Sequence, residues 1–96
     1  MGYKEEYAGL IRKCVSCGLR VKEVGDRTTR DYVGMNDMAG KAMGFKIPDK
    51  TIYIDNNMSM AGKVHTLRHE MIERKLMKDG KNYWEAHKEA LRGERG

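Results

Sequence analysis

One segment, VHTLRHEMIE at residues 64–73, concentrates the residue types that bind metals and transfer protons. His65 and His69 lie four residues apart, Glu70 follows directly, and Glu73 lies four residues after His69. Positions i and i+4 share one face of an α-helix, so a helix would align His65, His69 and Glu73. Imidazole nitrogens and carboxylate oxygens are common zinc ligands. The segment therefore predicts a metal site on a helix.

Two further residues indicate how such a site would work. Glu70 would lie to one side of the ligand face, where its carboxylate can accept a proton from a water at the metal. Another ligand must come from a different segment, and His87 is the best candidate because it lies in the apolar arc of the next predicted helix. Glu85 and Glu89 are weaker alternatives on the same helix. If the three histidines are instead ordinary surface or packed residues, the chain has no such site.

The elements that must position these residues follow from the apolar pattern and the turn residues. Apolar residues recur every three or four positions from Met60 to Met71, which predicts a helix that begins after a Ser59 cap and ends at Asp79-Gly80. A capping sequence at 82–85 begins the next helix. Upstream, Thr51 to Asp55 reads as a strand with alternating sides.

The first half of the chain gives weaker signals. We expect a helix from about Tyr3 to Lys13, a strand from Leu19 to Val24 with Thr28 to Val33 as its hairpin partner, and a short helix at 38–43 capped by Asn36-Asp37. The turn between the first two elements contains the CxxC sequence at 14–17. Reduced buried cysteines, a labile disulfide and half of a zinc site are all open interpretations, because a second CxxC is absent.

The composition limits the fold and the location. The 96 residues suit a single domain over residues 1–96, and 40% hydrophobic with 34% charged residues is typical of a globular chain. We expect an α+β fold, with a small sheet of two or three strands covered on one side by the N-terminal, histidine-bearing and C-terminal helices. No apolar run approaches the roughly 20 residues of a membrane span, and the N-terminus lacks the apolar core of a signal peptide, so we expect a cytoplasmic protein.

The sequence HEMIE at 69–73 resembles the HExxH helix of zincin metallopeptidases. The order of a strand, this helix and a following helix is similar to the core of the gluzincins, including their smallest members, the minigluzincins, over the second half of the chain. The resemblance implies that His69 binds zinc, that Glu70 is the general base and that His87 is the downstream ligand. Glu73 stands where the family has its second histidine, and a carboxylate can also bind zinc.

These arguments predict a minimal zinc-dependent hydrolase that cleaves peptides, with Ile52-Tyr53-Ile54 as the strand along which an extended peptide aligns. A zincin scaffold that keeps the fold without the metal is one alternative. Another is a small basic binding module of net charge +5 with a structural CxxC turn. Such a module would contact nucleic acid phosphates through basic residues that include Lys13, Arg20, Lys22, Arg27 and Arg30.

Overall fold

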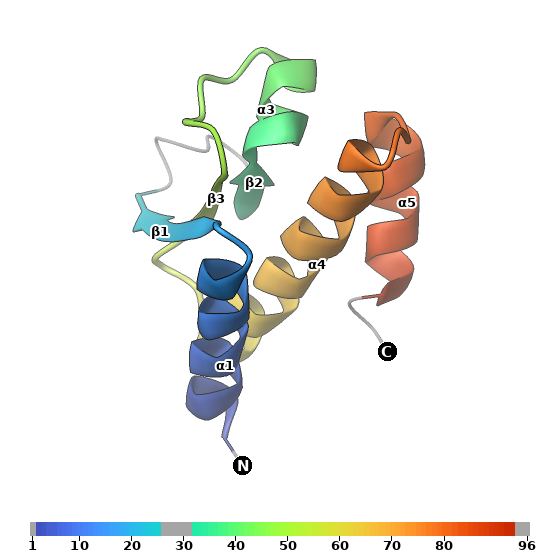
Figure 1. Ribbon diagram of the computed structural model, residues 1–96. Helices are drawn as coiled ribbons and strands as arrows, with labels where there is room; N and C mark the ends of the chain where they lie inside the picture. Colours follow the sequence, from blue (N-terminus) through green and yellow to red (C-terminus); the bar gives the residue numbers. More distant parts are fainter. Residues whose placement is uncertain (1, 26–31, 94–96) are drawn as a thin grey trace.

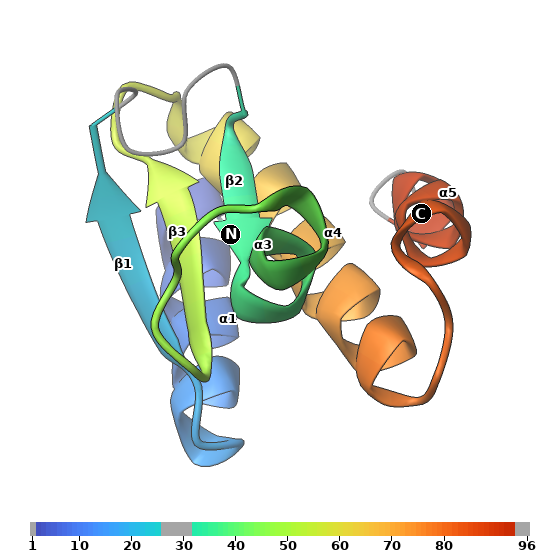
Figure 2. The ribbon, with the colours of Figure 1, turned by 90° about the horizontal axis from the view of Figure 1, so that it is seen from above.

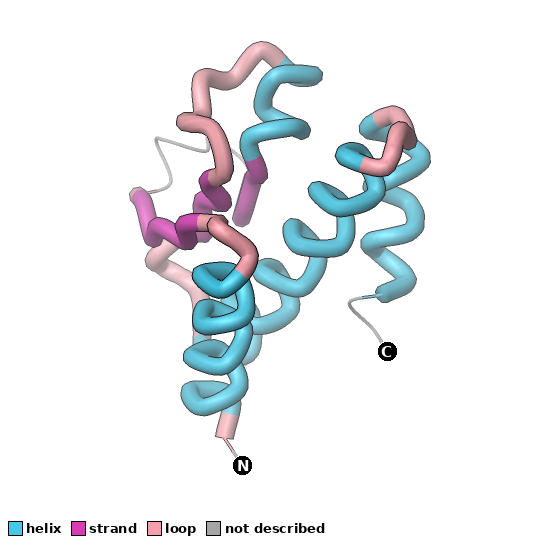
Figure 3. Tube along the Cα trace, viewed as in Figure 1, coloured by secondary structure: helices cyan, strands magenta, loops and turns pink. Residues whose placement is uncertain are grey.

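The computed structural model describes residues 2–25 and 32–93. In chain order its elements are α1 (Tyr3–Ser16), β1 (Arg20–Val24), β2 (Gly34–Asn36), α3 (Asp37–Met43), β3 (Thr51–Asp55), α4 (Met60–Lys78) and α5 (Tyr83–Gly93). The strands form one small sheet and the helices make up most of the remaining described chain (Figure 3). The predicted α+β fold with a small sheet is therefore confirmed.

The sheet is mixed, and β3 is its central strand. β1 runs parallel to β3 and β2 runs antiparallel to it, on the opposite edge. The predicted hairpin partner of β1 falls mainly on residues 28–31, outside the described part of the chain. Tyr32 and Val33, which are described, are not in a strand, and the next strand, β2, pairs with β3 instead of β1. Strand propensity indicated extended structure here, but it does not specify which strands pair.

The core lies between the sheet and two helices. Ile52 and Ile54 of β3 are completely buried and pack with Val64 and Leu67 of α4 and with Tyr7 of α1. Figures 1 and 2 show α1 and α4 on the same face of the sheet. The alternation predicted for this strand is confirmed, because Tyr53 on the opposite side is only half-buried.

The last helix, α5, packs along α4, which is its main partner. The sequence predicts that this helix covers the sheet, which is wrong, because Figure 2 shows α4 between the sheet and α5. The buried residues of α5 are Ala86 and Ala90. Their small side chains allow a close approach to α4 but offer little apolar surface for a further contact. α4 therefore has the sheet on one side and α5 on the other.

Hydrogen bonds at the helix starts confirm the predicted caps. The Ser59 hydroxyl accepts the Gly62 N–H at 3.1 Å and begins α4, and the Asn82 side chain accepts the Glu85 N–H at 2.9 Å at the start of α5. Each bond satisfies a backbone donor that has no partner within its helix. These caps set where both site-bearing helices begin.

Candidate metal centre

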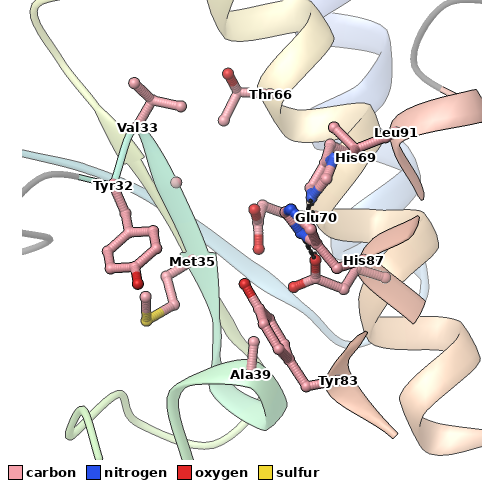
Figure 4. A pocket seen from close by; sticks show the side chains of 12 residues that line it. Tyr32, Val33, Met35, Ala39, Thr66, His69, Glu70, Tyr83, His87 and Leu91 are labelled. Atoms are coloured by element: carbon pink, nitrogen blue, oxygen red, sulfur yellow. Dashed lines mark hydrogen bonds and ion pairs between the residues drawn. The ribbon is translucent and has the colours of Figure 1, made fainter. Parts of the chain in front are cut away.

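Three side chains from α4 and α5 converge on one point. Glu73 Oε2 lies 3.0 Å from His69 Nε2 and 2.8 Å from His87 Nδ1, and the two nitrogens are 3.1 Å apart. His69 and Glu73 meet because they are one helical turn apart. His87 reaches them from the side of α5 that packs against α4. His69 and Glu73 are 7% and 2% exposed, whereas the His87 side chain is 35% exposed and forms the open side of the group. Figure 4 shows His69 and His87 close together, with Glu70 beside them.

The geometry of this triangle fits a metal ion. Ligand atoms on a tetrahedral zinc ion lie roughly 3.3 Å apart, because each bond is about 2.0–2.1 Å long. The three separations here fall short of that value by about half an ångström or less. Within residues 2–25 and 32–93, this is the only group of three His, Cys, Asp or Glu residues whose ligand atoms converge in this way. The group can hold a metal ion.

Glu70 lies beside this group, buried at 5% exposure, and lines the same pocket. Burial and the charge of Glu73 raise the pKa of the Glu70 carboxyl to about 8, although His69 and hydrogen bonds from Asn36 oppose this rise. Desolvation and a nearby like charge both disfavour the ionised carboxylate. A carboxyl with a pKa near neutral pH is suited to accept and return a proton.

Asn36, at the junction of β2 and α3, connects the two carboxylates. Its Nδ2 lies 3.0 Å from Glu70 Oε1 and 3.1 Å from Glu73 Oε1, and both bonds are buried. Its Oδ1 accepts the Ala39 N–H at 2.9 Å and caps α3, as the sequence predicted. The sequence predicts only this capping role for Asn36. Its link to α4 spans more than 30 residues, and no local pattern could have indicated it.

The neighbouring Asp37 fastens α3 to α4. It receives two hydrogen bonds from Arg74, at 2.7 and 3.2 Å, and one from the Lys50 N–H at 2.7 Å. Burial alone would raise the pKa of Asp37, but these hydrogen bonds and the charge of Arg74 lower it below its usual value. The ion pair therefore keeps β2 and α3 close to the helix that supplies two of the ligand side chains.

A pocket of about 180 Å³ opens over the group. β2, the preceding Tyr32 and Val33, and α3 form one wall, and α5 forms the other with Tyr83 and Leu91 (Figure 4). Tyr83 stacks on the His87 ring, with centroids 5.4 Å apart. Burial, together with the charges of Glu73 and Glu70, raises the pKa of Tyr83 to about 12, so its phenol keeps its proton at neutral pH. The pocket therefore combines a largely apolar wall with the polar group at its floor.

His65, the remaining predicted ligand, lies outside this group. It is exposed on α4, with its ring 6.4 Å from that of Tyr3 on α1. Position 65 is one turn before His69, on a part of α4 that lies near the start of α1. The weaker alternatives are also elsewhere, because Glu85 contacts Asn82 and Glu89 contacts Lys81. The structure thus brings together His69, Glu73 and His87, with Glu70 beside them.

The two cysteines lie at the C-terminal end of α1, as predicted, although this helix continues to Ser16 instead of ending near Lys13. Cys14 is buried and Cys17 is exposed, and both are free thiols. Among the described residues, no third metal-ligating side chain joins them. Burial raises the pKa of the Cys14 thiol, which is consistent with a core residue.

Three of the five basic residues of the alternative prediction lie in the described part of the chain, and all three are exposed. Arg20 and Lys22 are exposed on the same side of β1, and Lys13 lies near the end of α1. Arg27 and Arg30 lie outside the described residues. No helix within 2–25 and 32–93 has the length and apolar character that a membrane span requires.

The chain was compared with protein-family models, curated proteins and solved structures. None of them matches. The interpretation of the site therefore depends on its own geometry and chemistry.

Proposed function

We propose that this protein is a metal-dependent hydrolase of the zincin type, with His69, Glu73 and His87 as metal ligands and Glu70 as general base. The convergence of the three ligand atoms, with separations of 2.8–3.1 Å, carries the proposal. Catalytic zinc sites use three protein ligands and leave a fourth position open, and two histidines with one glutamate is one such set. The 35% exposure of His87 is consistent with an open position on the pocket side.

The ligand set also accounts for the departure from the HExxH pattern. Where zincins have a second histidine on the helix, this chain has Glu73. On the next helix, where the family has glutamate or histidine, it has His87. The three proposed ligands are then two imidazoles and one carboxylate, a set that catalytic zinc sites also use.

The residues support hydrolysis by a proton-shuttle mechanism. A divalent ion, when bound, supplies Lewis-acid polarisation of a substrate carbonyl and lowers the pKa of a water. Glu70 accepts the proton of the attacking water and returns it to the leaving group. The pKa of Glu70 is about 8 in the metal-free protein, and the positive charge of a bound ion would lower it and so favour the ionised form that this role requires. Tyr83 remains a hydrogen-bond donor at the pocket wall, where it can contact a polar substrate atom.

A peptide is the substrate that best suits this pocket, but it cannot align along β3 as predicted from the sequence. Both edges of β3 are paired, with β1 and with β2, so its backbone groups are already used. β2 is the edge strand beside the pocket, and Gly34 and Met35 belong to the pocket wall. An extended peptide could add to this edge and place its scissile bond over Glu70.

Metal analysis tests the proposal. The purified protein, dialysed and then loaded with zinc, should contain one zinc per chain, and His69→Ala should lose it. The Cys14→Ala/Cys17→Ala double variant is the matched control and should keep the metal. Iron(II) should be assayed in parallel, because two imidazoles and a carboxylate also bind this ion. Absence of both metals from the parent chain would refute the proposed site.

Hydrolysis is measured on the same samples with a quenched fluorescent peptide library. The loaded parent should cleave peptides, and removal of the metal by a chelator should stop cleavage. A fully loaded parent that cleaves none of the library would leave a metal-binding protein and refute the peptidase activity.

A further inference from the structure

We propose that Asn36 is the positioning residue of this site: its side-chain amide holds Glu73 in place as a metal ligand and Glu70 in place as the base. The inference rests on the proposed function, since it assumes the roles of the two carboxylates. It concerns a residue that belongs to neither α4 nor α5, the helices that carry the ligands and the base.

The amide of Asn36 matches the two carboxylates in number of donors. Its Nδ2 carries two hydrogens, and the two acceptors lie 3.0 Å away on Glu70 and 3.1 Å away on Glu73. Asn36 is completely buried, so no solvent molecule competes for these bonds. The Asn36 backbone N–H also bonds to Glu70. One residue thus supplies donors to both acidic groups.

The orientation of this amide is fixed by a second bond. Asn36 Oδ1 accepts the Ala39 N–H at 2.9 Å, the bond that caps α3. A flipped amide would lose the cap and would place an oxygen against two carboxylates, so only one assignment is chemically acceptable. The backbone of Asn36 belongs to β2 and lies opposite Ile52 of β3, so the sheet also positions this residue.

The bond from Asn36 gives the two oxygens of Glu73 different partners. Oε1 accepts the bond from Asn36, and Oε2 is therefore the oxygen that faces His69 and His87. This arrangement favours a carboxylate that binds the ion through a single oxygen. Hydrogen bonds of this kind orient metal ligands, and their removal typically lowers metal affinity or activity about 10- to 100-fold.

The consequence for Glu70 is a fixed distance from the ligand group. When both are ionised, two buried carboxylates three residues apart repel each other, and a donor between them reduces this repulsion. Since both bonds share one nitrogen, Glu70 cannot move away from Glu73 without breaking a buried hydrogen bond. Asn36 therefore couples the position of the base to the position of the ligand.

Asn36→Ser separates this role from the cap. Serine caps helices about as well as asparagine, but its short hydroxyl cannot reach both carboxylates. We expect zinc affinity, measured by competition with a chromophoric chelator, to fall about 10- to 100-fold. The visible spectrum of the cobalt(II)-substituted variant should also change, because Glu73 is then free to bind through both oxygens. Ser59→Ala is the matched control: it removes the exposed cap of α4 and should alter neither measurement.

If Asn36→Ser does not fold, a second variant and a measurement on the parent chain test the same role of Asn36. Asn36→Gly is the second variant, since glycine is tolerated at helix N-caps. In the parent chain, the side-chain N–H resonances of Asn36 should shift when zinc is added and remain protected from solvent exchange. Variants with parental zinc affinity and cobalt spectrum, or unshifted Asn36 resonances in the loaded parent, would overturn the positioning role and leave the metal site intact. A parent chain that binds neither zinc nor cobalt would instead refute the site, and the role of Asn36 with it.

Discussion

Glu70→Gln is the substitution that tests both the energetics and the chemistry of the site. The pKa of Glu70 is about 8 in the folded, metal-free protein, against an ordinary value of 4.5. At pH 7 the folded chain therefore holds a proton that the unfolded chain has released. One pKa unit corresponds to about 1.4 kcal/mol, so the interval between 4.5 and 7 lowers the free energy of unfolding by roughly 3 kcal/mol.

The sign of the pH dependence follows from the raised pKa. Between pH 4.5 and 8 the folded state binds more protons than the unfolded state, so this group makes the metal-free protein less stable as the pH rises through that window. Below pH 4.5 both states are protonated and the effect vanishes. Glutamine cannot ionise and should not show this loss. We therefore expect metal-free Glu70→Gln to be more stable than the parent by roughly 3 kcal/mol at pH 7.

Urea unfolding from pH 4 to 9, with a chelator present, measures this difference. Glu5→Gln on the exposed face of α1 is the matched control and should show no gain in stability at any pH. The metal-loaded Glu70→Gln variant should keep its metal and lose hydrolysis, because an amide cannot accept the proton of water. A stability difference that does not change with pH would refute the raised pKa of the buried Glu70 carboxyl. Hydrolysis at the parental rate would refute its role as base.

Other regions of the fold give three further predictions. Gly34→Ala should lower the free energy of unfolding by about 1–3 kcal/mol in urea titrations, because a Cβ there would lie 2.5 Å from Thr66 Cγ2. The double variant Gly34→Ala/Thr66→Ala should recover part of that loss, and no recovery would show that the clash with Thr66 is not its cause. Asp37→Asn should destabilise the protein by about 3 kcal/mol at pH 7, because it removes the charged partner of Arg74 in a largely buried contact. The difference from the parent should shrink as the pH falls from 3.8, where the unfolded parent begins to protonate, through the lower pKa of the folded Asp37. Finally, fluorescence anisotropy with single-stranded and duplex oligonucleotides should show no binding at about 50 mM salt, whereas binding that falls steeply with added salt would support the nucleic-acid alternative.

The sequence by itself determined the features that depend on helix geometry and on local capping. His69 and Glu73 are adjacent in space because a helix repeats every 3.6 residues, whatever surrounds it. The short connection between α4 and α5 and the apolar arc around His87 were sufficient to predict that this histidine faces α4. Caps such as Ser59 act within three residues, so they too can be recognised from the sequence.

Only the tertiary structure decided which distant segments meet. The parallel pairing of β1 with β3, the central position of β3 and the edge position of β2 depend on sheet order, which strand propensity does not encode. The same order places Asn36 against Glu70 and Glu73, across more than 30 residues of chain. His65 has the spacing of a ligand, yet the side on which α5 packs against α4 excludes it from the group. Helical spacing fixes which side chains share a face, and the packing of neighbouring elements decides what that face contacts.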